Sequence, residues 1–182
     1  YEQQFNSNFL IYENFISFFK QRKNGIASVL ELGCGTGLIP KKNPELFSNV
    51  DYTGIDISQK AIDFARKGST HTFKCEDFLK SDHPEKYDLI FALGVIDCVY
   101  DIELFLKKVL SSCRKYAYLN SCRGYHPELK KHKSQWRNDQ SCFYNDLSVK
   151  QLESFFINYG LSENQFSIRA QESGNKDPTN IH

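Results

Sequence analysis

Residues 29–37 constrain the fold of this chain more than any other part of the sequence. An apolar run from Val29 to Leu32, interrupted only by Glu31, leads into glycines at positions 33, 35 and 37. Glycine lets a backbone turn sharply and approach a ligand closely, because it has no Cβ atom. In parallel sheets, ligands bind beyond the carboxyl ends of the strands. The segment therefore predicts a buried strand that ends in a ligand-binding turn.

Strand and helix patterns alternate along most of the chain. Apolar or alternating runs predict strands over residues 27–32, 52–57, 70–75, 87–95, 116–120 and 165–171. Apolar residues at spacings of three and four, with capping residues, predict helices over residues 3–20, 58–67, 101–111 and 148–159. This order predicts an α/β fold with a doubly wound, mostly parallel sheet and helices on both faces.

Local signals bear on the helix expected after the glycine turn and on the last helix. Pro40 and Pro44 interrupt the helix that should follow the glycine turn, so we expect that helix to be short. Ser148 and Gln151 form a capping-box pattern at the start of the last helix, and Gly160 should end it.

Composition and organisation are those of an ordinary globular protein. The chain is 40% hydrophobic and 25% charged with a net charge of +1, so nothing demands a polyanionic partner. No linker or repeat divides it, and we expect one domain over residues 1–182, with 1–25 as an N-terminal cap helix and 121–145 as an insert. Neither a signal peptide nor an apolar run of about 18 residues is found. The 6 cysteines are scattered without a Cys-x-x-Cys pair, so we expect free thiols, no metal site, no membrane association and a cytoplasmic protein.

The glycine turn does not match two common nucleotide-binding patterns. A dinucleotide fingerprint would need a third glycine at position 38, which is Leu38. A P-loop would need a lysine after the last glycine, where Leu38 and Ile39 stand. An acid beside the turn, Glu31, also suits a cationic ligand better than a pyrophosphate.

Over residues 26–160 the sequence resembles the class I S-adenosylmethionine-dependent methyltransferases, whose first motif is apolar-(Asp/Glu)-apolar-Gly-x-Gly-x-Gly. Three further motifs of this family are matched along the chain, in the same order. The resemblance implies that Asp56 binds the ribose hydroxyls, that Asp77 and the backbone of Phe78 bind adenine, and that residues 91–95 meet the methionine moiety. The implied cofactor is S-adenosylmethionine, with S-adenosylhomocysteine as product. The implied cofactor-binding residues are Glu31, Gly33, Cys34, Gly35, Gly37, Asp56, Ile57, Asp77, Phe78, Leu93 and Gly94. The antiparallel strand that closes this family's sheet would begin near residue 182, so we expect it to be incomplete.

Catalytic and substrate residues are less well marked, because the cofactor's methyl group is activated by its own sulfonium. His126 and Asp97 are the candidate general bases for a hydroxyl acceptor. Arg123, Trp136 and Tyr12 are the candidate substrate residues. The basic, aromatic stretch 121–145 has two interpretations: a substrate lid for an anionic or aromatic molecule, or a solvated helix whose aromatic residues face the core.

The absence of three known motifs narrows the classes of molecule that could accept the methyl group. There is no Asn/Asp-Pro-Pro-Tyr for base amino groups, no Pro-Cys nucleophile for cytosine, and Thr36 departs from the Gly-Asp-Gly of aminopropyl-transferring relatives. The sequence therefore favours an enzyme that methylates an O or N atom of a small molecule, as a monomer or homodimer, with nucleic acid disfavoured. Two alternatives stay open: an RNA- or protein-modifying methyltransferase that uses the basic segment 123–137, and a non-catalytic S-adenosylmethionine-binding module.

Overall fold

The computed structural model describes residues 10–123, 125–136 and 140–169, without the side chains of residues 10, 134–136 and 140–142. The chain divides into two compact units, residues 1–122 and 123–182. Each unit is described below by itself. The expectation of one domain over residues 1–182, with its cap helix and insert, stays a prediction.

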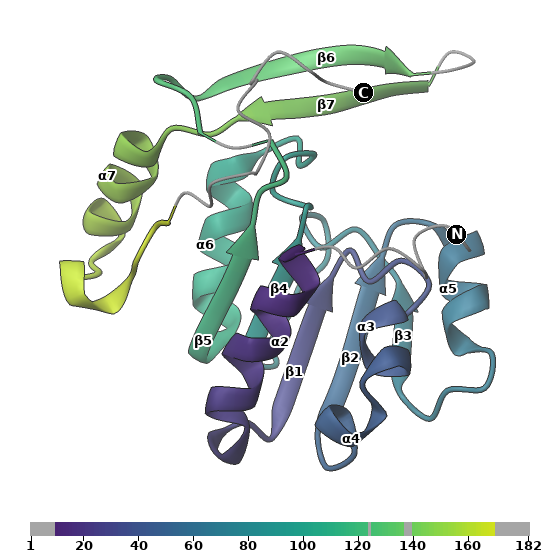
Figure 1. Ribbon diagram of the computed structural model, residues 1–182. Helices are drawn as coiled ribbons and strands as arrows, with labels where there is room; N and C mark the ends of the chain where they lie inside the picture. Colours follow the sequence, from purple (N-terminus) through teal and green to yellow (C-terminus); the bar gives the residue numbers. More distant parts are fainter. Residues whose placement is uncertain (1–9, 124, 137–139, 170–182) are drawn as a thin grey trace. The chain divides into compact units, whose positions relative to one another are not determined.

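The first unit is built on a five-stranded parallel sheet (Figure 1). The strand order is β3-β2-β1-β4-β5, so the topology reverses between β1 and β4, the place where such sheets bind ligands. The strands are β1 (Ser28–Leu32), β2 (Asp51–Asp56), β3 (Thr72–Cys75), β4 (Tyr87–Leu93) and β5 (Cys113–Asn120). The predicted doubly wound α/β fold is confirmed.

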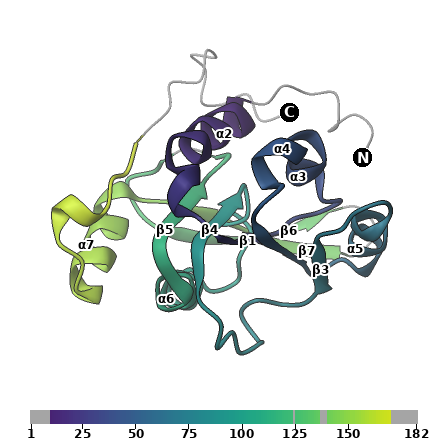
Figure 2. The ribbon, with the colours of Figure 1, turned by 90° about the horizontal axis from the view of Figure 1, so that it is seen from below.

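Helices cover both faces of this sheet (Figure 2). α2, α3 and α4 lie on one face, and α6 lies on the other. The helices are α2 (Leu10–Arg22), η1 (Lys23–Gly25), α3 (Leu38–Lys42), α4 (Pro44–Phe47), α5 (Gln59–Arg66) and α6 (Ile102–Ser112). Asn43 separates α3 from Pro44 at the start of α4, so this helix is short as expected, although Pro40 itself lies within the first turn of α3. Residues 3–9 of the expected first helix lie outside the described residues.

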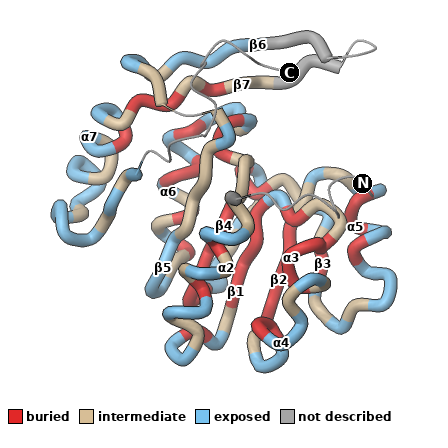
Figure 3. The backbone as a smooth tube through the Cα atoms, viewed as in Figure 1, coloured by how far each residue is buried: buried red, intermediate tan, exposed pale blue. Residues whose placement is uncertain are grey.

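Aromatic side chains fill much of the core between α2 and the sheet. Phe15 on α2 stacks on Phe91 of β4 with ring centroids 4.0 Å apart, and both are fully buried. Phe19 packs edge-on against Phe47 of α4. The central strands are buried almost throughout (Figure 3). Burying each such side chain contributes about 1.5–3 kcal/mol, so the core holds the sheet rigid beneath the glycine turn.

The second unit contains an antiparallel hairpin and a helix. Strands β6 (Lys130–Trp136) and β7 (Gln140–Asp146) pair with Lys130 opposite Asp146 (Figure 1). The interpretation of this stretch as a solvated helix is therefore wrong. Neither strand has an alternating sequence pattern, and the two are held by their antiparallel pairing, in which each strand satisfies backbone groups of the other.

Helix α7 (Val149–Tyr159) begins and ends where the sequence predicts. The Ser148 side chain accepts a hydrogen bond from Gln151 N at 3.4 Å, and Gly160 ends the helix with φ of 103°. The capping box is incomplete, because Gln151 Oε1 accepts from Leu129 N instead.

The strand expected over residues 165–171 is wrong where it can be checked. Residues Glu163–Gln165 form the short 3-10 helix η2, which Ser162 and Gln165 close with a reciprocal capping box. Residues 166–169 form no strand, and 170–171 lie outside the described residues. None of the helices in the part of the chain that the structure describes is long and apolar enough to cross a membrane.

Candidate cofactor site

The glycine turn follows β1 directly and is fastened to the end of β2. Gly33, Gly35 and Gly37 have φ values of 71°, 52° and 69°, which L side chains rarely adopt. Gly33 N and Cys34 N both donate to the Ile55 carbonyl, at 2.8 and 3.0 Å. The turn therefore stands at the carboxyl edge of the sheet, where the sequence predicts it.

The three glycines have different surroundings. A Cβ on Gly33 would lie 2.3 Å from Val95 Cγ2, and one on Gly37 would lie 2.7 Å from the Phe73 ring, so packing excludes side chains at both. A Cβ on Gly35 would meet nothing within 4 Å. Gly35 thus presents bare backbone to open space, as close approach to a ligand requires.

Asp56, the last residue of β2, holds this backbone in place. Its Oδ2 accepts from Gly35 N and its Oδ1 from Ser58 N, both at 2.9 Å. A carboxylate offers about four acceptor sites, so two remain for other donors. The next side chain, Ile57, is 77% exposed and provides an apolar surface beside this carboxylate.

Glu31 lies beneath the turn and is 5% exposed. It accepts a short hydrogen bond from the hydroxyl of Tyr52, which is also buried. Burial raises the pKa of Glu31 to about 8, opposed by the Tyr52 bond and assisted by the nearby Asp56 charge. Gly54 pairs with Glu31 across β1 and β2, where a Cβ would crowd Cys34. The sequence identified Glu31 but not Tyr52, because only the strand register brings the two together.

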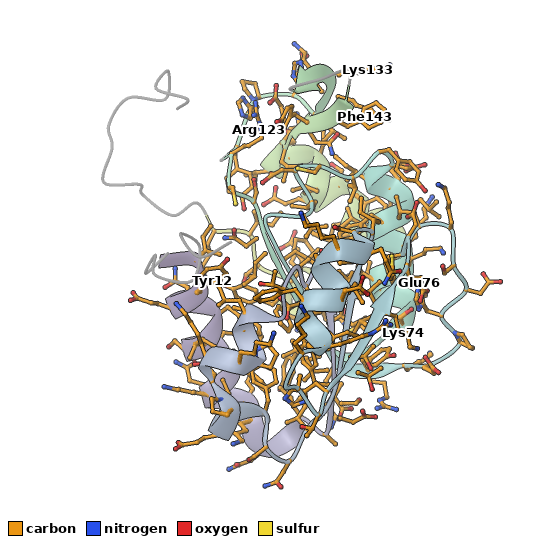
Figure 4. The ribbon with its side chains drawn as sticks, turned by 90° about the vertical axis from the view of Figure 1, so that its right-hand side faces the viewer. Tyr12, Lys74, Glu76, Arg123, Lys133 and Phe143 are labelled. Carbon is orange, nitrogen blue, oxygen red and sulfur yellow. The ribbon has the colours of Figure 1, made fainter. Side chains whose placement is uncertain are left out.

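Tyr12 lies near the N-terminal end of α2 (Figure 4) and packs partly buried against the core. Burial, the Glu31 carboxylate and Cys122 raise the pKa of Tyr12, in that order. The phenol therefore lies in the same region as Glu31, and its role as a substrate residue stays a prediction.

Asp77 and Phe78 follow β3, next to Glu76 (Figure 4). Asp77 Oδ1 accepts from Leu79 N at 3.0 Å, and Lys80 lies 3.2 Å from its Oδ2. Phe78 is 7% exposed. Asp77 thus stabilises a turn, and its proposed contact with adenine stays a prediction.

Leu93 ends β4 at the same edge of the sheet, and Gly94 follows it directly. Gly94 N donates to Asn120 O at 3.0 Å, and a Cβ on Gly94 would lie 2.7 Å from Cys122 Sγ. The ends of β4 and β5 are therefore tied together beside the turn.

Asp97 makes further hydrogen bonds between the segments that follow β4 and β5. It is 2% exposed, and its two oxygens accept from Ser121 Oγ at 2.5 Å and Cys122 N at 2.6 Å. Such burial and pairing suit a residue that positions the loop after β5. Its role as a general base stays a prediction.

In the second unit, Arg123 and His126 meet at a carboxylate that sequence reasoning missed. Arg123 Nη2 and His126 Nε2 each lie 3.5 Å from Asp146 Oδ1, and His132 Nε2 lies 2.6 Å from Asp146 Oδ2. No sequence spacing signals this cluster, since it depends on hairpin pairing. Trp136 is the last residue of β6, and its side chain lies outside what the structure describes.

A family model described as a methyltransferase domain matches residues 23–166. The chain belongs to this methyltransferase domain family. The resemblance to class I S-adenosylmethionine-dependent methyltransferases is confirmed, and the matched range includes β1, the glycine turn and Asp56.

Curated relatives of this methyltransferase domain match over part of their length. A malonyl-[acyl-carrier protein] O-methyltransferase of Bacillus cytotoxicus is 32% identical over 114 residues, which are 60% of this chain and 40% of the relative. A ubiquinone biosynthesis O-methyltransferase of Actinobacillus pleuropneumoniae is 31% identical over 99 residues, 47% of this chain and 42% of the relative. The chain thus spans well under half the length of these relatives.

Solved structures agree on the fold. The plantazolicin methyltransferase BpumL in complex with SAH (S-adenosylhomocysteine) is 27% identical with a TM-score of 0.55, covering 63% of this chain and 47% of that one. The N-terminal domain of EvdMO1 with SAH bound has a TM-score of 0.69 at 16% identity, covering 85% of this chain and 72% of that one. At that identity the second likeness supports the fold alone.

Proposed function

We propose that the chain binds S-adenosylmethionine at the glycine turn and transfers its methyl group to an O or N atom of a small molecule. The observation that supports this most strongly is the bare backbone at Gly35, held open by Asp56 at the switch point of a methyltransferase-family sheet.

The residues at this edge fit the cofactor in size and chemistry. Asp56 retains acceptor capacity for a vicinal diol, and exposed Ile57 offers an apolar face to a purine. Glu31 and Tyr12 suit the cationic methionine end, because an ionised Glu31 would be stabilised by a positive charge nearby. The remaining proposed contacts with S-adenosylmethionine are made by Cys34, Leu93, Gly94, Asp77 and Phe78.

S-adenosylmethionine supplies, when bound, a methyl group activated by its sulfonium. The protein's task is then to align an acceptor and exclude water. Asp97 holds Ser121 and Cys122, which directly follow β5, so we assign it a positioning role before a catalytic one. His126, with its imidazole 38% exposed, is the better candidate to accept a proton from a hydroxyl acceptor.

For the acceptor we propose a small molecule with an acidic or aromatic part, contacted by Tyr12, Arg123 and Trp136. Two relatives are named as O-methyltransferases, and a pavine N-methyltransferase is 34% identical over 105 residues. These names support small-molecule methylation, and they leave both oxygen and nitrogen acceptors open.

Calorimetry with S-adenosylmethionine, S-adenosylhomocysteine and NAD tests the cofactor. We expect the first two to bind, and Asp56→Ala to weaken them roughly 10- to 100-fold, since hydrogen bonds to a charged group are lost. Asp63→Ala, which removes an exposed acid on α5, is the matched control and should leave affinity unchanged. Binding of NAD alone, or wild-type affinity in Asp56→Ala, would contradict the proposal.

A labelled-methyl assay then tests the reaction. We expect label to enter small molecules of a metabolite pool and not RNA or protein. Label in RNA, with binding that weakens steeply as salt is added, would favour the RNA-modifying alternative. Cofactor binding without any transfer would favour the non-catalytic module.

A further inference from the structure

Lys108 on α6 lies against the loop that follows β3. Its ammonium donates to Phe78 O at 3.1 Å and to Ser81 O at 2.5 Å, and lies 5.8 Å from the centroid of the Phe78 ring. Ordering a lysine side chain costs conformational entropy, which two hydrogen bonds from a charged group can offset. Lys108 therefore acts as a bridge between α6 and this loop.

The preceding lysine on the same helix, Lys107, is arranged differently. Its ammonium lies 3.7 Å from Glu103 Oε2, one turn earlier on α6, and both side chains are more than half exposed. Phe105 shares a face of α6 with Lys108, because residues three apart are neighbours on a helix. The Phe105 ring also contacts the loop, with its centroid 6.0 Å from that of Phe78. One face of α6 thus holds the loop by an aromatic contact and a cation together.

The loop is fixed at its other end by the neighbouring strand. Glu76 N donates to Asp56 O at 2.9 Å, so the start of the loop is attached to the end of β2. Asp77 and Phe78, the residues proposed to bind adenine, come directly after this bond. They therefore lie between two anchors, the backbone of Asp56 and the ammonium of Lys108.

Between these anchors the chain makes a tight turn. Asp77 O accepts from Lys80 N at 3.0 Å and from Ser81 N at 3.1 Å. The carbonyls that follow in such a turn need donors from elsewhere, as they do at the end of a helix. Lys108 supplies a donor to two of them, so its removal would release the turn from α6.

We propose that Lys108 is a positioning residue that gives the cofactor site its preference for adenine over hypoxanthine. It acts through the loop, whose Asp77 carboxylate and Phe78 N–H are the groups proposed to bind adenine. This inference rests on the proposed function, because that function supplies the contacts with adenine.

The two bases differ at the edge that these groups would contact. Adenine presents an amino donor and the N1 acceptor, whereas hypoxanthine presents a carbonyl acceptor and an N1–H donor. A carboxylate and an N–H matched to adenine therefore meet like groups in hypoxanthine, and polar groups left unpaired on binding lower affinity. Hydrogen bonds weaken steeply when misaligned, so the preference requires both groups to be in place. The N–H and the carbonyl of Phe78 flank one Cα atom, and a bond that fixes the carbonyl limits rotation of the N–H.

Calorimetry of the whole chain with S-adenosylhomocysteine and its deaminated analogue, S-inosylhomocysteine, tests this role. We expect the wild type to bind the adenine compound roughly 10- to 100-fold more tightly. Lys108→Met keeps an apolar stem and removes the ammonium. It should weaken binding of the adenine compound about 5- to 20-fold and that of the analogue less than about twofold. Lys108→Arg retains the donors and should restore most of the preference.

Lys107→Met is the matched control, because it removes the same charge from the same helix. Its ratio of affinities for the two nucleosides should equal that of the wild type. An equal weakening of both nucleosides in Lys108→Met would show a purely structural role and overturn the inference. An equal fall of the ratio in Lys107→Met would show a general effect of charge and would overturn it too.

Hydrogen exchange gives a local measurement in the chain without ligand. Lys108→Met should speed exchange of the Lys80 and Ser81 amides, which close the turn, and leave the amides of β1 unchanged. Unaltered exchange at these two amides would contradict the anchoring role. Circular dichroism verifies folding, and if Lys108→Met unfolds the chain, Lys108→Gln is the deciding variant by the same ratio.

The wild type separates this inference from the proposed function. A wild type that binds neither nucleoside contradicts the proposed function, and the inference with it. A wild type that binds S-adenosylhomocysteine without preferring it to the analogue keeps the proposed function and overturns the inference alone.

Discussion

Two buried carboxylates at opposite ends of the same sheet have opposite environments. Asp88, near the amino end of β4, accepts from Ala27 N at 2.8 Å and lies 3.1 and 3.3 Å from Arg114 and Lys115. Burial alone would raise the pKa of Asp88, but these partners hold it below the ordinary value. Glu31, near the carboxyl end of β1, accepts a hydrogen bond from Tyr52, but its burial, assisted by the nearby acid Asp56, outweighs that bond and raises its pKa to about 8.

The difference shows that the two ends of the sheet have different roles. At the amino end, charge is neutralised within the protein, and the carboxylate stabilises the fold. At the carboxyl end, the acid is buried with no cation beside it among the residues that the structure describes, which destabilises its charged form. A ligand that supplied a cation would stabilise that charged form. The two ends can therefore be distinguished by the sign of their effects on stability.

The largest expected effect is at Glu31. Its folded pKa lies above the unfolded value of about 4.3, so the unfolded chain ionises first and stability falls as pH rises from about 4 to 8. Glu31→Gln should raise the free energy of unfolding by about 2–4 kcal/mol at pH 8 and change it little at pH 4. Urea unfolding followed by circular dichroism measures this, with exposed Glu45→Gln as control. An equal effect at both pH values would refute the comparison.

Asp88 should respond with the opposite sign. Its folded pKa is depressed, so its stabilisation is present above the unfolded value of about 3.9 and is lost as pH falls through the folded pKa. We expect Asp88→Asn to lower the free energy of unfolding by about 1–3 kcal/mol at pH 7, moderated by the half-exposed Arg114 and Lys115. The same urea titrations at pH 7 and pH 3 test it, with Asp63→Asn as control. No loss at pH 7 would show that the pairing at the amino end is unimportant.

Cofactor binding should change the protonation state of Glu31. A cation near Glu31 favours its ionised form, so binding should release a proton below pH 8. The affinity of the wild type for S-adenosylmethionine, divided by that of Glu31→Gln, should increase by up to about tenfold per pH unit between pH 6 and 8. Calorimetry in two buffers of different ionisation enthalpy detects the proton. Identical proton release in wild type and variant would exclude Glu31 as its source.

The smallest effect is expected at Gly35. Gly35→Ala meets no neighbour within 4 Å, so its cost comes only from the positive φ of 52°, about 1 kcal/mol in the free energy of unfolding. Gly37→Ala should cost more, because its Cβ would also lie 2.7 Å from the Phe73 ring. Thermal unfolding of the two variants measures the difference. If Gly35→Ala proved the more damaging, the space above the turn would be occupied by the protein itself.

Local sequence was enough to predict the order of the strands and helices in the first unit. Apolar runs, the capping residues Ser58 and Asp101 and the prolines at 40 and 44 act over a few neighbouring residues, so their effect is visible in the sequence. The family motif indicated the ligand and the acids near the ends of β1, β2 and β3. The helix and strand expected within residues 123–171 failed because their patterns there were short and polar, and long-range pairing decided them.

Only the tertiary structure decided which partner each charged group has. Glu31 and Asp88 are both acids within apolar strands, yet strand register and the neighbouring chain segments give one a tyrosine and the other two cations. His132 and Asp146 are brought together by the pairing of β6 with β7. Electrostatic environment depends on distances between residues far apart in the chain, and a linear pattern does not contain those distances.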